Sequence, residues 1–260
     1  MSIQQTAPAA AGVGIGAVAE RIICGLHPVS HLLRNEPDRI EELFVQRQLG
    51  AERSARLQGL ESFRGRRREI ESAELDRLTG TAKHQGVAAR VRAAEMLTEA
   101  AARDLVYALD SPLLLVLDGI QDPRNFGACL RTAEAAGVDL VVIGRSRNVG
   151  ITPVVSKVAA GAAELQTIAS VGNLARFLAF LGEAGVRVIG ADGDADQSLY
   201  GQDLAGPLAL VLGAEGQGLR RLTRERCDAL VRLPMLGVVE SLNVAVATGI
   251  CLYEALRQRS

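Results

Sequence analysis

The second half of the chain carries a series of short, almost uninterrupted apolar runs separated by stretches with helical spacing. Five of these runs follow one another along the sequence: LLLVLD, DLVVIG, VRVIGA, LALVLGAE and ALVRLPM. A strand that is apolar on both faces is buried on both faces, which is typical of a parallel sheet with helices packed on each side. From Leu113 onward we therefore expect an α/β domain built on a parallel sheet.

The residues before this region alternate between shorter elements. We expect helices in PVSHLLRN, ERSARLQGLESFRG and SAELDRLTG, and strands in IEELFVQ, RREIES and GVAARVRA. An Ala-rich, helix-prone stretch that ends at Ser111 and Pro112 then leads into the large domain. We divide the chain into a disordered tail (1–20), a small α/β domain (21–95), a linker (96–111) and a large domain (112–260).

Cysteine and histidine spacing argues against a metal site. The four cysteines stand far apart, without C-x-x-C spacing, at Cys24, Cys129, Cys227 and Cys251. They are typical of reduced core thiols in a cytoplasmic protein, and His27 and His84 also lack metal-ligand spacing. This spacing predicts no metal site. No run of 18 apolar residues is present, so we also expect no membrane span.

The formal net charge of -1 provides no global basic field, and 3% aromatic residues make a base-stacking platform unexpected. A nucleic acid would have to meet a local patch. The segment FRGRRREIES, with Arg64, Arg66, Arg67 and Arg68, is the candidate. An ordinary solvated charged face is the simpler explanation of the same residues.

Polar residues gather in the loops that follow three of the predicted strands. In open α/β sheets, ligands bind beyond the carboxyl ends of the strands. The first loop carries Asn125 and Arg131, and the second carries Glu215 between glycines. The third ends in Ser241 and Asn243, just before an apolar helix. These side chains are the candidate functional residues.

Simpler roles remain open for each of these residues. Asn125 and Ser241 both stand where a helix N-cap is expected. Arg131 is spaced to pair with Glu134 on the same helix, and Glu215 is compatible with an exposed turn. A dinucleotide-binding dehydrogenase is not supported, because no G-x-G-x-x-G follows the first strand of the large domain.

Taken together and in this order, the three loops resemble the three motifs of the SpoU class of RNA ribose 2'-O-methyltransferases. DPRNFGACLRTAEAAG resembles the first motif, LVLGAEGQGL the second and LPMLGVVESLNVAVATG the third. The similarity continues in KVAAGAAE, GADGDADQSLY, GLHPV and KHQGVAARV, so it covers nearly everything after the first 20 residues. Small departures from the family pattern occur at Arg124, Phe126 and Ala245.

The resemblance implies a parallel-sheet domain with a trefoil knot, preceded by a small ribosomal-protein-like domain that binds RNA. It implies S-adenosyl-L-methionine as the methyl donor and a homodimer as the assembly. The branch of the family that the chain resembles methylates a guanosine ribose in the peptidyl-transferase loop of 23S ribosomal RNA, in the large subunit. A transfer RNA ribose methyltransferase and a non-catalytic RNA-binding protein are the alternatives.

The resemblance also implies the roles of individual residues. The implied catalytic residues are Asn125, Arg131, Glu215, Ser241 and Asn243. The implied cofactor-binding residues are Gly213, Leu233, Met235, Leu236 and Leu242. Arg131 would lie beside the attacking hydroxyl, and because a guanidinium stays protonated we expect it to stabilise a developing alkoxide. A deprotonated Arg131 acting as the base, held by a dimer partner, is the alternative.

Overall fold

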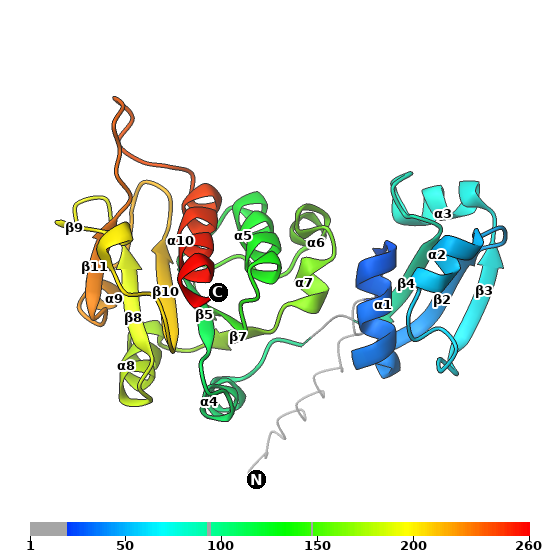
Figure 1. Cartoon of the computed structure of the whole chain (residues 1–260), viewed down its shortest axis with the longest axis horizontal. Helices are drawn as coiled ribbons and strands as arrows, with labels where there is room; N and C mark the ends of the chain where they lie inside the picture. Colours follow the sequence, from blue (N-terminus) through cyan, green and yellow to red (C-terminus); the bar gives the residue numbers. More distant parts are fainter. Residues whose placement is uncertain (1–19, 93–94, 147) are drawn as a thin grey trace, which may run out of the picture.

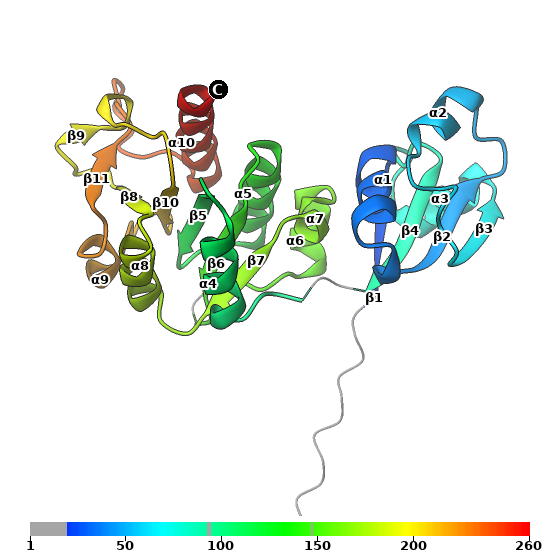
Figure 2. The same ribbon diagram turned by 60° about the horizontal axis from the view of Figure 1, so that its bottom comes forward.

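The structure is a computed structural model that describes residues 20–92, 95–146 and 148–260 (Figure 1). Its strands form two separate sheets, one of four strands and one of seven. The tail predicted for residues 1–20 lies outside the described residues, except for Glu20 at the start of the first strand. Figures 1 and 2 show the two sheets in separate parts of the molecule.

The small sheet has the strand order β1-β4-β2-β3 and is mixed. β1 pairs antiparallel with β4, β4 antiparallel with β2, and β2 parallel with β3. The strands are β1 (Glu20–Cys24), β2 (Ile40–Gln46), β3 (Arg66–Ile70) and β4 (Val87–Arg92). The helices are α1 (Leu26–Asn35), η1 (Pro37–Arg39), α2 (Ala51–Arg56) and α3 (Ser72–Thr79).

The large sheet has the strand order β7-β6-β5-β10-β8-β11-β9, and every pairing in it is parallel. This confirms the parallel sheet expected from the apolar runs. All six residues of its central strand β5 are buried. The strands are β5 (Leu113–Asp118), β6 (Leu140–Gly144), β7 (Ile168–Val171), β8 (Arg187–Ala191), β9 (Gln197–Ser198), β10 (Leu208–Gly213) and β11 (Ala229–Arg232).

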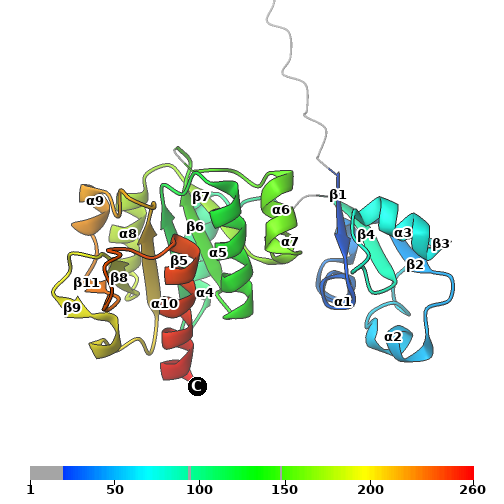
Figure 3. The same cartoon turned by 90° about the horizontal axis from the view of Figure 1, so that it is seen from above.

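Helices cover both faces of the large sheet, which explains why its strands are apolar on both sides (Figure 3). One face packs against α5 (Pro123–Ala135), α6 (Pro153–Ala159), α7 (Ala162–Leu165) and α10 (Val244–Arg259). The other packs against α4 (Glu99–Ala108) and α8 (Leu174–Glu183), and the short α9 (Arg221–Arg224) contacts α8. A 3-10 turn, η2 (Leu199–Gly201), completes the domain.

Several elements differ from the sequence-based expectation. The helix expected over residues 52–65 ends at Arg56, and the strands β1, β7 and β9 were not predicted. The linker expected over residues 96–111 was predicted to be helix-prone and does contain a helix, α4, but Ala102 and Val106 of this helix are buried against the large sheet. These short strands and this helix are stabilised by packing against a sheet, which a local pattern does not report.

After β11 the chain returns across the sheet to α10, which packs against α5 and β10. This return through residues 233–243 is the segment in which the predicted knot would be threaded, and the knot itself stays a prediction. No helix in the described parts of the chain is long and apolar enough to span a bilayer.

Candidate active site at the carboxyl edge of the large sheet

Strand order places three polar loops at one edge of the large sheet. β6 and β7 extend the sheet to one side of β5, while the later strand β10 pairs with the other side of β5. Such a reversal leaves a crevice at the carboxyl ends of the strands, where ligands of open α/β sheets bind. The loops after β5 and β10 therefore start next to each other.

Asp118, the last residue of β5, ties these two loops together. Its side chain is 1% exposed, and Oδ2 accepts a hydrogen bond of 3.0 Å from the backbone N–H of Arg220. The Arg220 Nε lies 3.3 Å from the other carboxylate oxygen, and the Ala214 N–H donates to the Asp118 carbonyl at 3.1 Å. Asp118 was not among the predicted site residues. A single carboxylate at the end of a buried apolar strand has to be paired, and this could have indicated its role.

Gly213 permits the loop after β10 to fold back on itself. A Cβ at this position would lie 2.1 Å from the carbonyl carbon of Gly218, a distance no side chain can occupy. The loop closes through a 2.8 Å hydrogen bond from the Gly218 N–H to the Ala214 carbonyl. Glu215 is exposed at the tip of this turn.

Three of the five predicted catalytic side chains meet in one hydrogen-bonded chain. The Asn243 amide nitrogen donates to Asn125 Oδ1 at 2.9 Å, and the Asn125 amide nitrogen donates to Glu215 Oε2 at 3.1 Å. The three residues come from the start of α5, the loop after β10 and the N-cap of α10, and the two hydrogen bonds join residues 90 and 118 positions apart in the sequence. The fold thus assembles a polar group that ends in an exposed carboxylate.

The helix caps differ from the prediction. Asp122, not Asn125, caps α5 by accepting from the Arg124 N–H at 2.8 Å, and Asn243, not Ser241, caps α10 by accepting from the Ala245 N–H at 3.0 Å. Asp and Asn are both favoured N-cap residues, so the sequence alone did not decide between neighbouring candidates. As a result the Asn125 amide is available to join Asn243 and Glu215.

Arg131 and Ser241 are exposed, and neither side chain forms a hydrogen bond or ion pair with any described residue. The alternative in which Arg131 pairs with Glu134 is therefore not found in the structure. Arg131 lies on α5, the helix that begins with Asn125 in its first turn. An exposed guanidinium that no described residue neutralises is suited to an anionic ligand.

The predicted cofactor-binding residues lie at the end of β10 and in the return segment. Leu233 and Leu242 are half-buried, Met235 is 37% exposed and Leu236 is fully exposed. An adenosyl group carries no phosphate and needs no phosphate-binding loop, so exposed apolar side chains of this kind are suited to it. A cavity of about 380 Å³ near Gly144, Asn173 and Arg221 contains none of the predicted site residues.

The buried thiols have structural roles. Cys129 Sγ on α5 lies 3.4 Å from Thr248 Oγ1 on α10, which joins the two helices that carry Asn125 and Asn243. Burial raises the pKa of Cys129 to about 11 and that of Cys251 to about 12, so both stay protonated near neutral pH. His84 is buried as well, and its Nδ1 accepts from the Gly86 N–H at 2.9 Å.

Two family models match the chain. The SpoU rRNA Methylase family model matches residues 112–253, and the model of the RNA 2'-O ribose methyltransferase substrate-binding domain matches residues 22–97. The chain belongs to the SpoU rRNA methylase family, and it is a methyltransferase. This confirms the resemblance seen in the three loops and the small domain.

Relatives of known name extend this assignment. The chain is 50% identical to the 23S rRNA (guanosine-2'-O-)-methyltransferase RlmB of Shewanella oneidensis, over 92% of this chain and 97% of the relative. It is 46% identical to RlmB of Escherichia coli K12, over 92% and 99% of the two chains. Among solved structures, an AdoMet-bound rRNA methyltransferase of Sinorhizobium meliloti aligns with TM-score 0.69 and 25% identity, over 92% and 87%.

Proposed function

We propose that the protein transfers a methyl group from S-adenosyl-L-methionine to the ribose 2'-hydroxyl of a guanosine in 23S ribosomal RNA, in the peptidyl-transferase loop. The observation that carries this proposal is the hydrogen-bonded group formed by Asn125, Glu215 and Asn243, together with an exposed Arg131 on the same helix as Asn125. The names of the RlmB relatives support the nucleoside and the RNA, and their similarity covers both domains.

The proposed reaction is an in-line attack of the ribose 2'-oxygen on a methyl carbon, in which the O–C bond forms as the S–C bond breaks. S-adenosylmethionine would supply that methyl group and leave as S-adenosylhomocysteine. Arg131 stabilises the negative charge that develops on the 2'-oxygen, and a phosphate oxygen or water takes the proton. Asn125 and Asn243 orient the ribose, and Glu215 anchors the pair of amides. Holding the reacting atoms at about 3 Å removes most of the entropic barrier of a bimolecular step.

The remaining site residues hold the cofactor. Backbone groups of the loop that starts at Gly213 and of the segment from Leu233 to Leu236 bind the adenosyl group. Leu242 packs beside the adenosyl group, and the Ser241 hydroxyl donates a hydrogen bond close to the cofactor. The backbone of the Gly213 loop is accessible because glycine permits the close turn.

The small domain, residues 21–95, binds the RNA, and residues 112–260 carry out catalysis. Residues 20–92 contain 14 Arg and Lys against 11 Asp and Glu, although the whole chain has a net charge of -1. On the sheet of this domain, Arg66 Nε and Arg90 Nη1 lie 3.0 Å and 2.9 Å from the buried Glu42 carboxylate. Arg68 and Arg90 also stack on the Phe44 ring, at 5.7 Å and 5.4 Å. Such ordered guanidinium groups suit RNA phosphates.

The protein acts as a cytoplasmic homodimer. Support for the homodimer comes from large apolar side chains that stay exposed in the structure: Val246 and Tyr253 on α10 are both 52% exposed. In the return segment, Leu236, Val238 and Val239 are at least 70% exposed. Clusters of exposed apolar side chains mark interaction sites, and α10 follows the return segment directly in the chain.

The test is methylation of 23S rRNA from a strain that lacks this gene, with labelled S-adenosylmethionine, followed by mapping of the product. We expect a single 2'-O-methylguanosine in the peptidyl-transferase loop. Label in transfer RNA would overturn the substrate, and failure to bind S-adenosylmethionine would overturn the enzyme assignment. Arg131→Ala is the inactive control, because it leaves the fold unchanged.

A further inference from the structure

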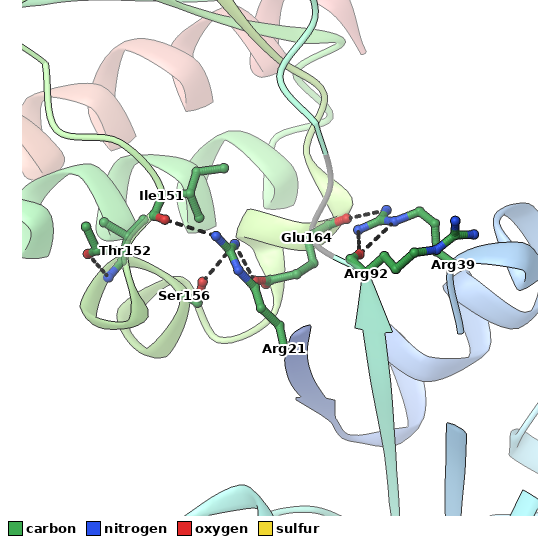
Figure 4. Close-up of polar contacts among 8 residues, drawn as sticks. Arg21, Arg39, Arg92, Ile151, Thr152, Ser156 and Glu164 are labelled. Atoms are coloured by element: carbon green, nitrogen blue, oxygen red, sulfur yellow. Dashed lines mark hydrogen bonds and ion pairs between the residues drawn. The ribbon is translucent and has the colours of Figure 1, made fainter. Parts of the chain in front are cut away.

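The small domain is joined to the large one by a buried ion pair as well as by the chain (Figure 4). Arg21, on β1, crosses to the segment that contains α6 and α7. Its Nη2 donates to the Ile151 carbonyl at 2.9 Å, and its Nη1 donates to Ser156 Oγ at 3.2 Å and to Glu164 Oε1 at 3.1 Å. The Glu164 side chain is 3% exposed and that of Arg21 is 18% exposed.

A second group of contacts surrounds this pair. Arg39 Nη1 donates to the Glu164 carbonyl at 3.2 Å, and Leu165 packs against the core of the small domain. A Cβ at Gly161 would lie 3.2 Å from the ring of Pro28 on α1. A cavity of about 170 Å³ remains between the domains, so the junction is held at a few points and not by a continuous apolar core.

The segment of α6 and α7 that contacts Arg21 packs closely against α5, the helix that carries Asn125 and Arg131. A Cβ at Gly127 of α5 would lie 2.8 Å from the Val155 carbonyl and 2.9 Å from Val158 Cβ. α6 and α5 are therefore in backbone contact. Any change in the position of α6 and α7 has to move α5, on which Asn125 and Arg131 lie.

The backbone of this segment is bent at the point that presents Glu164. Ala160 and Gly161, between α6 and α7, have φ values of 53° and 98°. Alanine rarely adopts a left-handed conformation, and such strain persists only where surrounding contacts hold it. The bend starts α7 in a new direction, so that Glu164 meets Arg21 (Figure 4).

We infer that Arg21 and Glu164 are positioning residues that lock the RNA-binding domain at a fixed distance and orientation from Arg131. The inference rests on the proposed function. A buried carboxylate needs a paired cation, so removal of Arg21 makes the docked arrangement less favourable. RNA bound to the small domain then places its target ribose at α5 without any change in the relative orientation of the two domains.

Breaking the pair should leave both domains folded but misaligned. The small domain still binds RNA, and the large domain still binds its cofactor. The RNA bound by the small domain no longer brings the target ribose to the large domain in a fixed position. The affinity gained from binding one RNA at both domains at once is therefore lost. The loss should therefore depend on the length of the RNA.

The experiment compares Arg21→Ala, Glu164→Gln, the single changes Arg21→Glu and Glu164→Arg, and the exchanged pair that combines these two, all in the full-length chain. Arg77→Ala is the matched control, because Arg77 lies on α3 and bonds only to the Ala73 carbonyl of its own helix. With a large 23S rRNA fragment, we expect Arg21→Ala to lower kcat/KM about tenfold, mainly through KM. With a short hairpin that carries only the target guanosine, activity should stay within about twofold of the unaltered protein.

Rescue separates a specific pair from general damage. The exchanged pair should recover more activity on the large fragment than either of its single changes, with unchanged S-adenosylmethionine affinity. Equal activity of Arg21→Ala and Arg77→Ala on the large fragment would overturn the inference. So would an exchanged pair no better than its singles, or an equal loss on the short hairpin.

A structural measurement is independent of the RNA substrate. Small-angle scattering of the full chain should show a larger radius of gyration for Arg21→Ala than for Arg77→Ala. An unchanged radius would refute the docking role even if methylation fell. If the unaltered protein methylates no RNA, the proposed function fails while the scattering comparison still decides whether the pair docks the domains.

Discussion

Two hydrogen-bonded groups link distant parts of this chain, and they differ in exposure. At the domain junction, Arg21 and Glu164 are largely buried and each satisfies the other's charge. At the carboxyl edge of the large sheet, Asn125, Glu215 and Asn243 join three loops, yet two of the three are exposed. The buried group fixes geometry, whereas the exposed group has hydrogen-bonding capacity left for a ligand.

The same comparison extends to the arginines. Arg21 makes three hydrogen bonds across the junction, while Arg131 makes none with any described residue. A side chain that is already fully bonded contributes to the structure, and an unbonded one at a sheet edge is available for chemistry. Variants at the two kinds of position should therefore separate activity from stability.

The largest effect is expected for Arg131→Ala. Loss of a donor that stabilises developing charge should reduce methylation by about 10²–10³-fold. Because Arg131 is exposed and has no protein partner among the described residues, the melting temperature should stay within about 1 °C. Single-turnover methylation and a thermal melt measure the two quantities. A fall in stability equal to that of a core variant would place Arg131 among the structural arginines.

Gly213→Ala tests the loop that bears Glu215. The new methyl group would overlap the Gly218 backbone, so the loop must open, at a cost of about 1–3 kcal/mol in unfolding free energy. Urea unfolding measures that loss, and titration with S-adenosylmethionine should show weaker binding. The control is Gly193→Ala, at the same edge of the sheet, where a Cβ would meet nothing within 4 Å. Equal behaviour of the two variants would contradict the role of the close turn.

Asn243 combines a cap with a site contact, and two substitutions separate them. Asn243→Asp keeps the oxygen that accepts from the Ala245 N–H but cannot donate to Asn125, so activity should fall about tenfold while stability is kept. Asn243→Ala should also lose about 1 kcal/mol of cap energy. Thr98→Ala, which removes the cap of α4 away from the site, should lower stability alone. Normal activity of Asn243→Asp would exclude the amide from the site.

Much of the fold was predictable because its signals are local. The apolar runs predicted five strands of the large sheet, and the helix predicted in SAELDRLTG is α3, which ends at Gly80 with a φ of 65°. β7 and β9 have four and two residues, too short for a period to be read, and they exist because a neighbouring strand pairs with them. Helix α4 looked like a linker because the sheet against which it packs follows it in sequence.

The site was predictable as a set of residues but not as a set of contacts. Asn125, Glu215 and Asn243 stood out because each is polar in a loop after a buried strand, and their meeting depends on strand order. The caps at Asp122 and Asn243 were assigned to neighbours, since short polar residues compete for the same position. The Arg21–Glu164 pair had no sequence signal at all, because 143 residues separate its members.

The smallest effect at neutral pH is expected from the buried thiols. Like the Arg21–Glu164 pair, they are buried and contribute to structure, not to the exposed site. Burial raises the pKa of Cys251 to about 12 and of Cys129 to about 11, above the ordinary thiol value of 9.0. Below pH 9 both the folded and the unfolded thiols are protonated, so stability is independent of their titration. Above pH 9 only the unfolded thiols ionise, so unfolding free energy should fall by up to about 1.4 kcal/mol per pH unit for each thiol.

Urea unfolding at pH 8, 9 and 10, with and without Cys251→Ala, measures this dependence. The variant is less stable at every pH because it leaves a cavity, but its slope above pH 9 should be shallower by one proton. Methylation by the unaltered protein should show no matching change across this range, since neither thiol lies among the exposed site residues. A parallel loss of activity and stability with ionisation of one thiol would mean that the helix contact between Cys129 and Thr248 also sets the geometry of Asn125 and Asn243.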